Sequence, residues 1–158
     1  GNYAASLLPL EKAHEEGYGE AIYLDPKNKE YFEETGSSNL FFVFKNGELA
    51  TPKSDAILQS ITRRSIVDIA REDLGLTMKH RKVHIDELAD MEEVGACGTA
   101  EVITPVGTIN YKGKDYNFYA DGQEPGPITT KLYDRLTQIQ VRDVEDTHNW
   151  TVKIGEKK

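Results

Sequence analysis

The dipeptide Asn46-Gly47 constrains the fold of this chain more than any other feature of its sequence. An apolar and aromatic run at 40–45 precedes it, and a second β-prone run at 48–51 follows it. Asn-Gly between two such runs is a strong hairpin signal, because the favoured two-residue turn needs positive φ at both positions. We therefore expect residues 48–51 to pair back on 40–45.

The other elements are predicted from the spacing of apolar residues and from the Gly, Pro and polar residues that bound each run. The predicted strands cover 20–24, 31–35, 82–84, 102–105, 108–111, 116–119 and 150–154. The predicted helices cover 4–16 (kinked or begun at Pro9 and closed by Gly17), 61–72 (with Ile61, Ile66, Ile69 and Ala70 near one face), 85–91 and 128–139. Strands and helices interleave and hairpins are present, so the predicted fold class is α/β of the mixed α+β kind.

Composition limits the kind of protein. The 158 residues fit one domain, and 38% hydrophobic with 29% charged residues is typical of a globular chain. The net charge of −8 is scattered, which argues against nucleic acid or an anionic membrane as a partner. The single cysteine, Cys97, excludes an internal disulfide and fits a reducing compartment. No apolar run is long enough to span a bilayer. The expected location is the cytoplasm.

The start of the helix at 61–72 is the first candidate site. Ser60 is a good N-cap, and free N–H groups at a helix start attract anions. Arg63 and Arg64 occupy the first turn, where cations oppose the helix dipole. A bound phosphate would relieve that conflict. The alternative is an ordinary capped helix whose arginines pair with Asp68 or with another element.

Two further candidates are weak when each is taken alone. Glu34, before the turn at 36–39, could face the pyridine nitrogen of pyridoxal 5′-phosphate (PLP) and keep it protonated, or it could be a surface glutamate beside Glu33. In Cys97-Gly98-Thr99-Ala100, small residues allow the backbone close to a ligand and Thr99 offers a hydroxyl. A tight strand entry would have the same pattern.

The order of these segments resembles the class IV aminotransferases, the fold-type IV enzymes that use PLP. Their pattern of Glu, any residue, a small residue, two more, Asn, an apolar and an aromatic residue is met by Glu34–Phe41. Leu49–Thr51 matches the next part of the pattern, which is an apolar residue, any residue and Thr. Leu58–Arg63 matches the last part, which is an apolar residue, any residue, Gly or Ser, a second apolar residue, any residue and a basic residue.

Within this class the chain is similar to the branched-chain amino-acid aminotransferases over nearly all of its length. The supporting segments are Gly1–Ala4, Cys97–Ala100 followed by Thr104-Pro105, Leu136–Gln140 and the acidic approach to Trp150. The resemblance implies that residues 1–158 are the cofactor-binding large C-terminal domain, with a D-amino-acid aminotransferase-like fold that is β-barrel-like and flanked by helices. It also implies amino-group transfer between Leu, Ile or Val and 2-oxoglutarate in branched-chain amino-acid metabolism, in a cytoplasmic homodimer.

The resemblance assigns roles to seven residues. The contacts implied for PLP are its phenolic oxygen with Tyr3, its ring nitrogen with Glu34, its ring face with Leu58, and its phosphate with the N–H groups of Ile61 and Thr62 and the hydroxyl of Thr99. Backbone N–H groups of Thr99 and Ala100 are implied for the substrate carboxylate.

The chain departs from the family pattern in three places. Gln59-Ser60 stands where Pro-Gly is more usual, and Ser37-Ser38 replaces bulkier residues. The Schiff-base lysine and the small N-terminal domain are expected upstream of Gly1, so no catalytic residue is assigned here. Lys12, the nearest lysine, is expected along the first helix. We therefore expect the chain alone to lack transaminase turnover.

Other readings stay open at this point. One is another class IV enzyme, a D-amino-acid aminotransferase or an aminodeoxychorismate lyase. Another is a non-enzymatic domain that binds PLP or a phosphate compound, or that serves as a dimerising scaffold. His80 and His84 have a spacing that could hold a metal on a helix face, but a third ligand is missing, so no metal is expected. Cys97 as a thiol nucleophile lacks an identified base, and a buried small residue beside the cofactor is the preferred reading.

Overall fold

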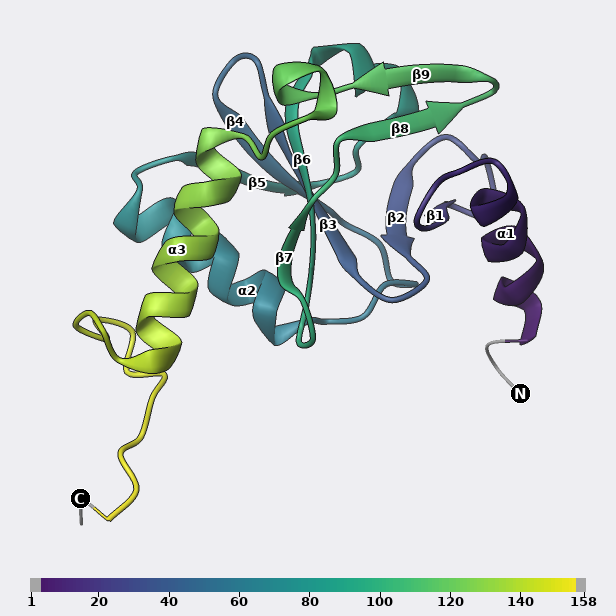
Figure 1. Ribbon diagram of the computed structural model, residues 1–158. Coiled ribbons are helices and arrows are strands. Elements are labelled where there is room, and N and C mark those ends of the chain that lie inside the picture. The colour runs from purple at the N-terminus through teal and green to yellow at the C-terminus, as the bar shows by residue number, and fades with distance from the viewer. Residues whose placement is uncertain (1–3, 156–158) are drawn as a thin grey trace.

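Seven strands form one sheet around a central strand, β3 (Asn39–Phe44), in the computed structural model, which describes residues 4–155 (Figure 1). The path runs β1-β2-β3-β4-β5, and β6 pairs with β3 and β7. The other strands of this sheet are β1 (Ile22–Leu24), β2 (Phe32–Thr35), β4 (Glu48–Pro52), β5 (Thr77–Arg81), β6 (Met91–Gly98) and β7 (Val102–Pro105). All pairs are antiparallel except β4 with β5.

Helices and a second hairpin complete the architecture. They are α1 (Ala4–Glu15), α2 (Ile61–Asp68) continued by a π-helical turn (Ile69–Asp73), α3 (Pro127–Val141), the 3₁₀ turns Ile85–Asp90 and Tyr119–Gly122, and the hairpin β8 (Thr108–Tyr111) with β9 (Lys114–Asn117). No helix within residues 4–155 has the length and apolar character needed to cross a bilayer.

The hairpin predicted at Asn46-Gly47 is confirmed. Val43 pairs with Leu49 across it, and Gly47 has φ +84°. Asn46 does not have positive φ, so the turn is not the two-residue form with positive φ at both positions, and the Gly47 N–H instead donates to the Phe44 carbonyl at 2.8 Å. Every residue of β3 and β4 is buried. Such complete burial means that this hairpin lies between two cores rather than at a surface.

The two faces of β3 supply the two hydrophobic cores. Leu40, Phe42 and Phe44 point to one face, while Phe41 and Val43 point to the other, as the two-residue period of a strand requires. The β8–β9 segment and the 3₁₀ turn at 85–90 cover the first core. Helices α2 and α3 cover the second (Figure 1). Each fully buried Leu or Phe contributes about 1.5–3 kcal/mol of burial free energy. The mixed α+β class is confirmed, with strand layers and flanking helices enclosing the cores.

Strand β6 is the largest element absent from the sequence prediction. Its residues 91–98 include two glutamates and two glycines, which lower strand propensity. Both features have structural causes. A Cβ on Gly95 would lie 2.1 Å from Cζ of Phe41, so only glycine lets the ring pack against the strand. Glu93 is 3% exposed and accepts hydrogen bonds from the N–H of Ile128 (2.9 Å) and of Thr129 (2.7 Å), so it caps α3.

Several other expectations need correction. The strand predicted at 82–84 is wrong, because the strand there is β5 at 77–81 and His84 caps the following 3₁₀ turn instead. The closing strand predicted at 150–154 is also wrong, since this segment has no strand pairing. The first helix does not begin at Pro9, because α1 runs through that residue. The predicted C-terminal cap at Gly17 is confirmed by its φ of +88°.

Candidate functional site

Glu34 is held by a hydrogen-bond network at one end of the sheet. Its Oε2 accepts from Nδ2 of Asn39 at 3.0 Å and from the backbone N–H of Leu58 at 3.1 Å. Nδ2 of Asn39 also donates to the Leu58 carbonyl at 3.3 Å. Glu34 is half-buried, and its carboxylate is not free, because it fixes the loop that precedes α2. The neighbouring Glu33 points elsewhere and accepts from Ser54 Oγ at 2.7 Å.

Strand register brings two of the three sequence segments to the same end of the sheet. Glu34 pairs with Asn39 across β2 and β3, and Asn39 pairs with Cys97 across β3 and β6. Thr99 and Ala100 follow Cys97 in the turn between β6 and β7, and both are exposed. The carboxylate of β2 and the small-residue turn after β6 therefore belong to one edge.

The entry to α2 has the predicted capping geometry. Ser60 is the N-cap, and its Oγ accepts from the N–H of Arg63 at 3.2 Å. Thr62 is half-buried, but the side chains of Leu58 and Ile61 are 72% and 65% exposed. Ile61 was expected near the same helix face as Ile66, but its side chain is not buried with that face. Apolar side chains this exposed beside a helix N-terminus are available for contact with a ligand.

Arg63 is buried without a carboxylate partner within residues 4–155. It is 4% exposed, and its guanidinium donates to the Pro52 carbonyl and to Gln59 Oε1, each at 3.2 Å. Burial lowers the pKa of Arg63 from its ordinary value. Its predicted alternative partner, Asp68, instead accepts from Arg71 at 3.0 Å. The helix entry thus holds a cation that is neutralised only at a distance.

The thiol-nucleophile reading of Cys97 is wrong. The side chain is completely buried, and this desolvation raises the pKa of its thiol to about 12, although the nearby Arg63 opposes the shift. A thiol of that pKa is protonated at neutral pH and is not a nucleophile. The expectation of a buried small residue at this position is confirmed.

The two histidines do not face one another on a helix. His80 lies on β5 with Nδ1 3.1 Å from Thr51 Oγ1, while His84 caps the 3₁₀ turn by accepting from the N–H of Asp86. Among the described residues, no cluster of His, Cys, Asp or Glu is suited to a metal ion.

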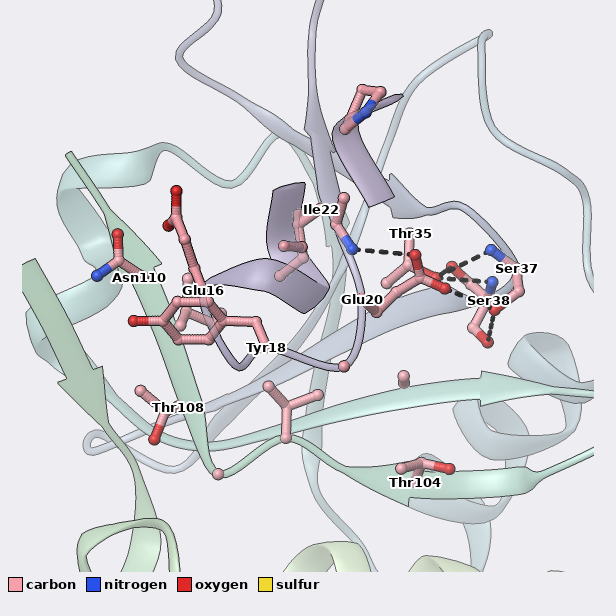
Figure 2. A pocket seen from close by; sticks show the side chains of 18 of the residues that line it. Glu16, Tyr18, Glu20, Ile22, Thr35, Ser37, Ser38, Thr104, Thr108 and Asn110 are labelled. Carbon is pink, nitrogen blue, oxygen red and sulfur yellow. Dashed lines mark hydrogen bonds between the residues drawn. The ribbon is translucent and has the colours of Figure 1, made fainter. Parts of the chain in front are cut away.

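A polar chain also ties the turn before β3 to the turn after β6. Ser38 Oγ donates to the carboxylate of Glu101, and Ser37 Oγ donates to Glu20 at 3.1 Å. These residues border a cavity of about 650 Å³ beside α1. Figure 2 shows Glu20, Ser37 and Ser38 at one end of it, with Tyr18 and Asn110 toward the other. Sequence reasoning missed Glu101, since no local pattern links residues 63 positions apart.

The predicted residues thus divide into two groups. One group lies at one edge of the sheet, on the β2 end, the α2 entry and the β6–β7 turn. Its members are Glu34, Leu58, Ile61, Thr62, Thr99 and Ala100. Tyr3 lies outside the described residues.

Comparison with known proteins gives a consistent answer. Residues 1–109 match the model of the family described as amino-transferase class IV. A branched-chain-amino-acid aminotransferase of Haemophilus influenzae is 49% identical over 159 residues, which is 98% of this chain and 46% of that protein. The chain spans about half the length of the curated relatives that it matches.

Solved structures agree with the sequence relatives. The branched-chain aminotransferase from Escherichia coli superposes with a TM-score of 0.81 at 30% identity, over 99% of this chain and 50% of that one. The enzyme from Thermobaculum terrenum in its PLP form gives 0.76 at 36% identity, over 87% and 42%. The fold and the sequence motif therefore point to the same family, and the chain belongs to the class IV aminotransferases.

Proposed function

We propose that this chain is the large C-terminal, PLP-binding domain of a branched-chain amino-acid aminotransferase. The observation that carries the proposal is the Glu34 carboxylate, oriented by Asn39 and by the Leu58 N–H at the edge where Thr99 and the α2 entry lie. The names of the relatives support the substrate class, because they are branched-chain aminotransferases at 44–49% identity.

The residues of this edge have the donor set that PLP requires. When bound, PLP supplies an electron sink for negative charge at the substrate Cα. Glu34 would hold a proton on the ring nitrogen, because two hydrogen-bond donors fix its Oε2 in place. Leu58, 72% exposed, would cover the ring face. Tyr3 would bind the phenolic oxygen.

The start of α2 would hold the phosphate. The backbone N–H groups of Ile61 and Thr62 lie in the first turn after the Ser60 cap, where the helix dipole favours an anion. The hydroxyl of Thr99 would add a third donor from the β6–β7 turn. Backbone N–H groups of Thr99 and Ala100 would bind the carboxylate of the amino acid or 2-oxo acid and so orient its Cα.

The relatives are about twice as long as this chain, since it spans 46% of the Haemophilus influenzae protein. We therefore assign the Schiff-base lysine and the small domain to sequence upstream of Gly1. The full protein would be a cytoplasmic homodimer that exchanges amino groups between Leu, Ile or Val and 2-oxoglutarate. The 158-residue chain alone should show no transaminase turnover.

Binding of PLP to the purified chain, measured by isothermal titration calorimetry, tests the cofactor role. Glu34→Gln should weaken binding about tenfold, because it removes a charge-assisted contact. Glu33→Gln is the matched control, since its side chain faces Ser54 instead. Equal effects of the two changes would exclude the ring-nitrogen role of Glu34.

Borohydride trapping after incubation with PLP, followed by intact mass and peptide mapping, tests the domain assignment. No stoichiometric adduct on a single lysine of residues 1–158 is expected. A stoichiometric adduct on Lys12 would contradict it. In the full-length protein, amino transfer from leucine but not from D-alanine is expected. The reverse preference would assign the chain to a different class IV enzyme.

A further inference from the structure

A second cavity, of about 730 Å³, lies on the helix-covered side of the sheet. Its walls come from α2, from α3 and from the segment after α3. Of the residues assigned to PLP or the substrate, Ile61 alone borders this cavity, and Glu34, Leu58, Thr62 and Thr99 do not. It is therefore distinct from the site proposed above.

One wall of this cavity is cationic. Arg63 and Arg64 line it beside His80, and Asp68, the acidic residue in its lining, is paired with Arg71 at 3.0 Å. Burial, followed by the positive charges of Arg63 and Lys53, lowers the pKa of His80. Cationic surroundings of this kind disfavour a further positive charge and favour an incoming anion.

The Arg63 guanidinium makes this wall unusual. Arg63 is 4% exposed. Within residues 4–155, the guanidinium donates hydrogen bonds to a carbonyl oxygen and an amide oxygen, and both are neutral. The Glu34 carboxylate acts on this cation only at a distance, without a hydrogen bond. A buried cation without a direct ionic partner is costly, and a carboxylate from outside would relieve that cost. Guanidinium groups suit carboxylates because two parallel N–H groups match the two oxygens.

Another part of the lining is apolar. Leu136 and Ile139 of α3 and Trp150 supply it. The ring of Trp150 stacks on His148 with centroids 4.2 Å apart and planes 14° apart, and the side chain remains 37% exposed. An indole held in place with one part accessible is a suitable surface for an aliphatic or aromatic group.

We propose that this cavity binds a small organic anion, a carboxylate with an apolar body. The carboxylate contacts the arginines at the start of α2, and the apolar body covers Trp150 and α3. The two walls together define this chemistry, since inorganic phosphate would use the cations alone and a neutral apolar molecule would leave Arg63 unpaired. The site does not depend on the function proposed above.

Trp150 is the one tryptophan of the chain, so its fluorescence reports directly on the cavity. We would titrate the chain, without PLP, with sodium hexanoate as the probe. A saturable blue shift of Trp150 emission is expected, because the aliphatic tail removes water from the indole. Hexan-1-ol, which has the same tail without the charge, should bind much more weakly, and inorganic phosphate should cause no such shift.

A variant of the exposed arginine tests the charge. Arg64→Gln should weaken hexanoate binding about tenfold. Lys131→Gln, an exposed change on α3 away from the cavity, should leave it unaltered. The titration contains no PLP, so its result is separate from the fate of the PLP proposal. Circular dichroism confirms that each variant is folded.

Three results would overturn the proposal. One is the absence of a saturable shift with hexanoate in the folded chain. Another is equal affinity for hexanoate and hexan-1-ol, and the third is equal affinity of Arg64→Gln and Lys131→Gln for hexanoate. In the last two cases the cationic wall would contribute nothing.

Discussion

The backbone N–H of Leu58 donates a hydrogen bond of 3.1 Å to Oε2 of Glu34, from 24 residues away in the chain. Asn39 donates to the same oxygen and to the carbonyl of Leu58. The carboxylate and the loop before α2 are therefore set relative to each other by one small network. Replacing the side chain of Glu34 or Asn39, or moving the backbone of Leu58, should therefore change the positions of the other two residues.

Asn39→Ala should lower the free energy of unfolding by about 1–3 kcal/mol, because it removes two side-chain hydrogen bonds at a residue that is 4% exposed. It should also weaken PLP binding, since Glu34 loses one of its two donors. Urea unfolding and calorimetry measure the two effects. Asn28→Ala, at an exposed turn position, is the control and should change neither. Unaltered PLP affinity in Asn39→Ala would show that Asn39 does not orient Glu34.

Gly95→Ala should destabilise the chain by about 1–3 kcal/mol, because the new methyl group meets the Phe41 ring. Gly19→Ala is the matched control, as nothing lies within 4 Å of the Cβ position there. Adding Phe41→Leu to Gly95→Ala should recover part of the loss, measured by urea unfolding. If the ring does not cause the clash, the second change will only add its own cost.

Asp25 is expected to control part of the acid sensitivity. Backbone N–H groups of Asn28, Glu30 and Tyr31 lower the pKa of its carboxyl from 3.8 to about 2. A carboxyl whose pKa is lower in the folded state stabilises fully above the unfolded value and loses that effect as pH falls through the folded value. The stability deficit of Asp25→Asn should therefore be present at pH 7 and should fade between about 3.8 and 2. Urea unfolding across this range checks it, with Asp55→Asn as the exposed control. A deficit independent of pH would contradict it.

Cys97 should resist thiol reagents in the folded chain. Its thiol is buried and has a pKa of about 12, so the reactive thiolate is scarce at pH 8. Reaction with a colorimetric disulfide reagent should be at least about a hundredfold slower than in urea, where the pKa returns toward its ordinary value. A rate in buffer similar to that in urea would mean that β6 opens easily.

Local signals predicted the elements that depend on local chemistry. Asn46-Gly47 fixes its own turn, and Ser60 caps the helix beside it, so both were predictable. Strand β6 was not predictable, because Gly95 is required by its contact with Phe41 and Glu93 by its hydrogen bonds to α3, and both partners are distant in sequence. The same reason hides the link between Ser38 and Glu101.

The candidate site followed from a different kind of information. The motif fixed the order of Glu34, the α2 entry and Thr99, but the hydrogen bonds of Asn39 and the register through Cys97 required coordinates. The exposure of Ile61 was missed because helical period alone cannot separate a core position from an uncovered apolar one. The segment at 150–154 has strand-like composition, but Trp150 packs on His148 instead of joining the sheet.

The Glu93 carboxylate has a consequence for motion. It rises from the central sheet and receives the first N–H groups of α3, as well as the hydroxyl of Thr129 at 2.7 Å. If α3 slid along its axis, a carboxylate that is 3% exposed would lose all three donors at once. The central sheet and α3 should therefore move as one rigid body. Any adjustment that admits or releases a ligand then falls to the connecting segments rather than to the packing of α3 on the sheet.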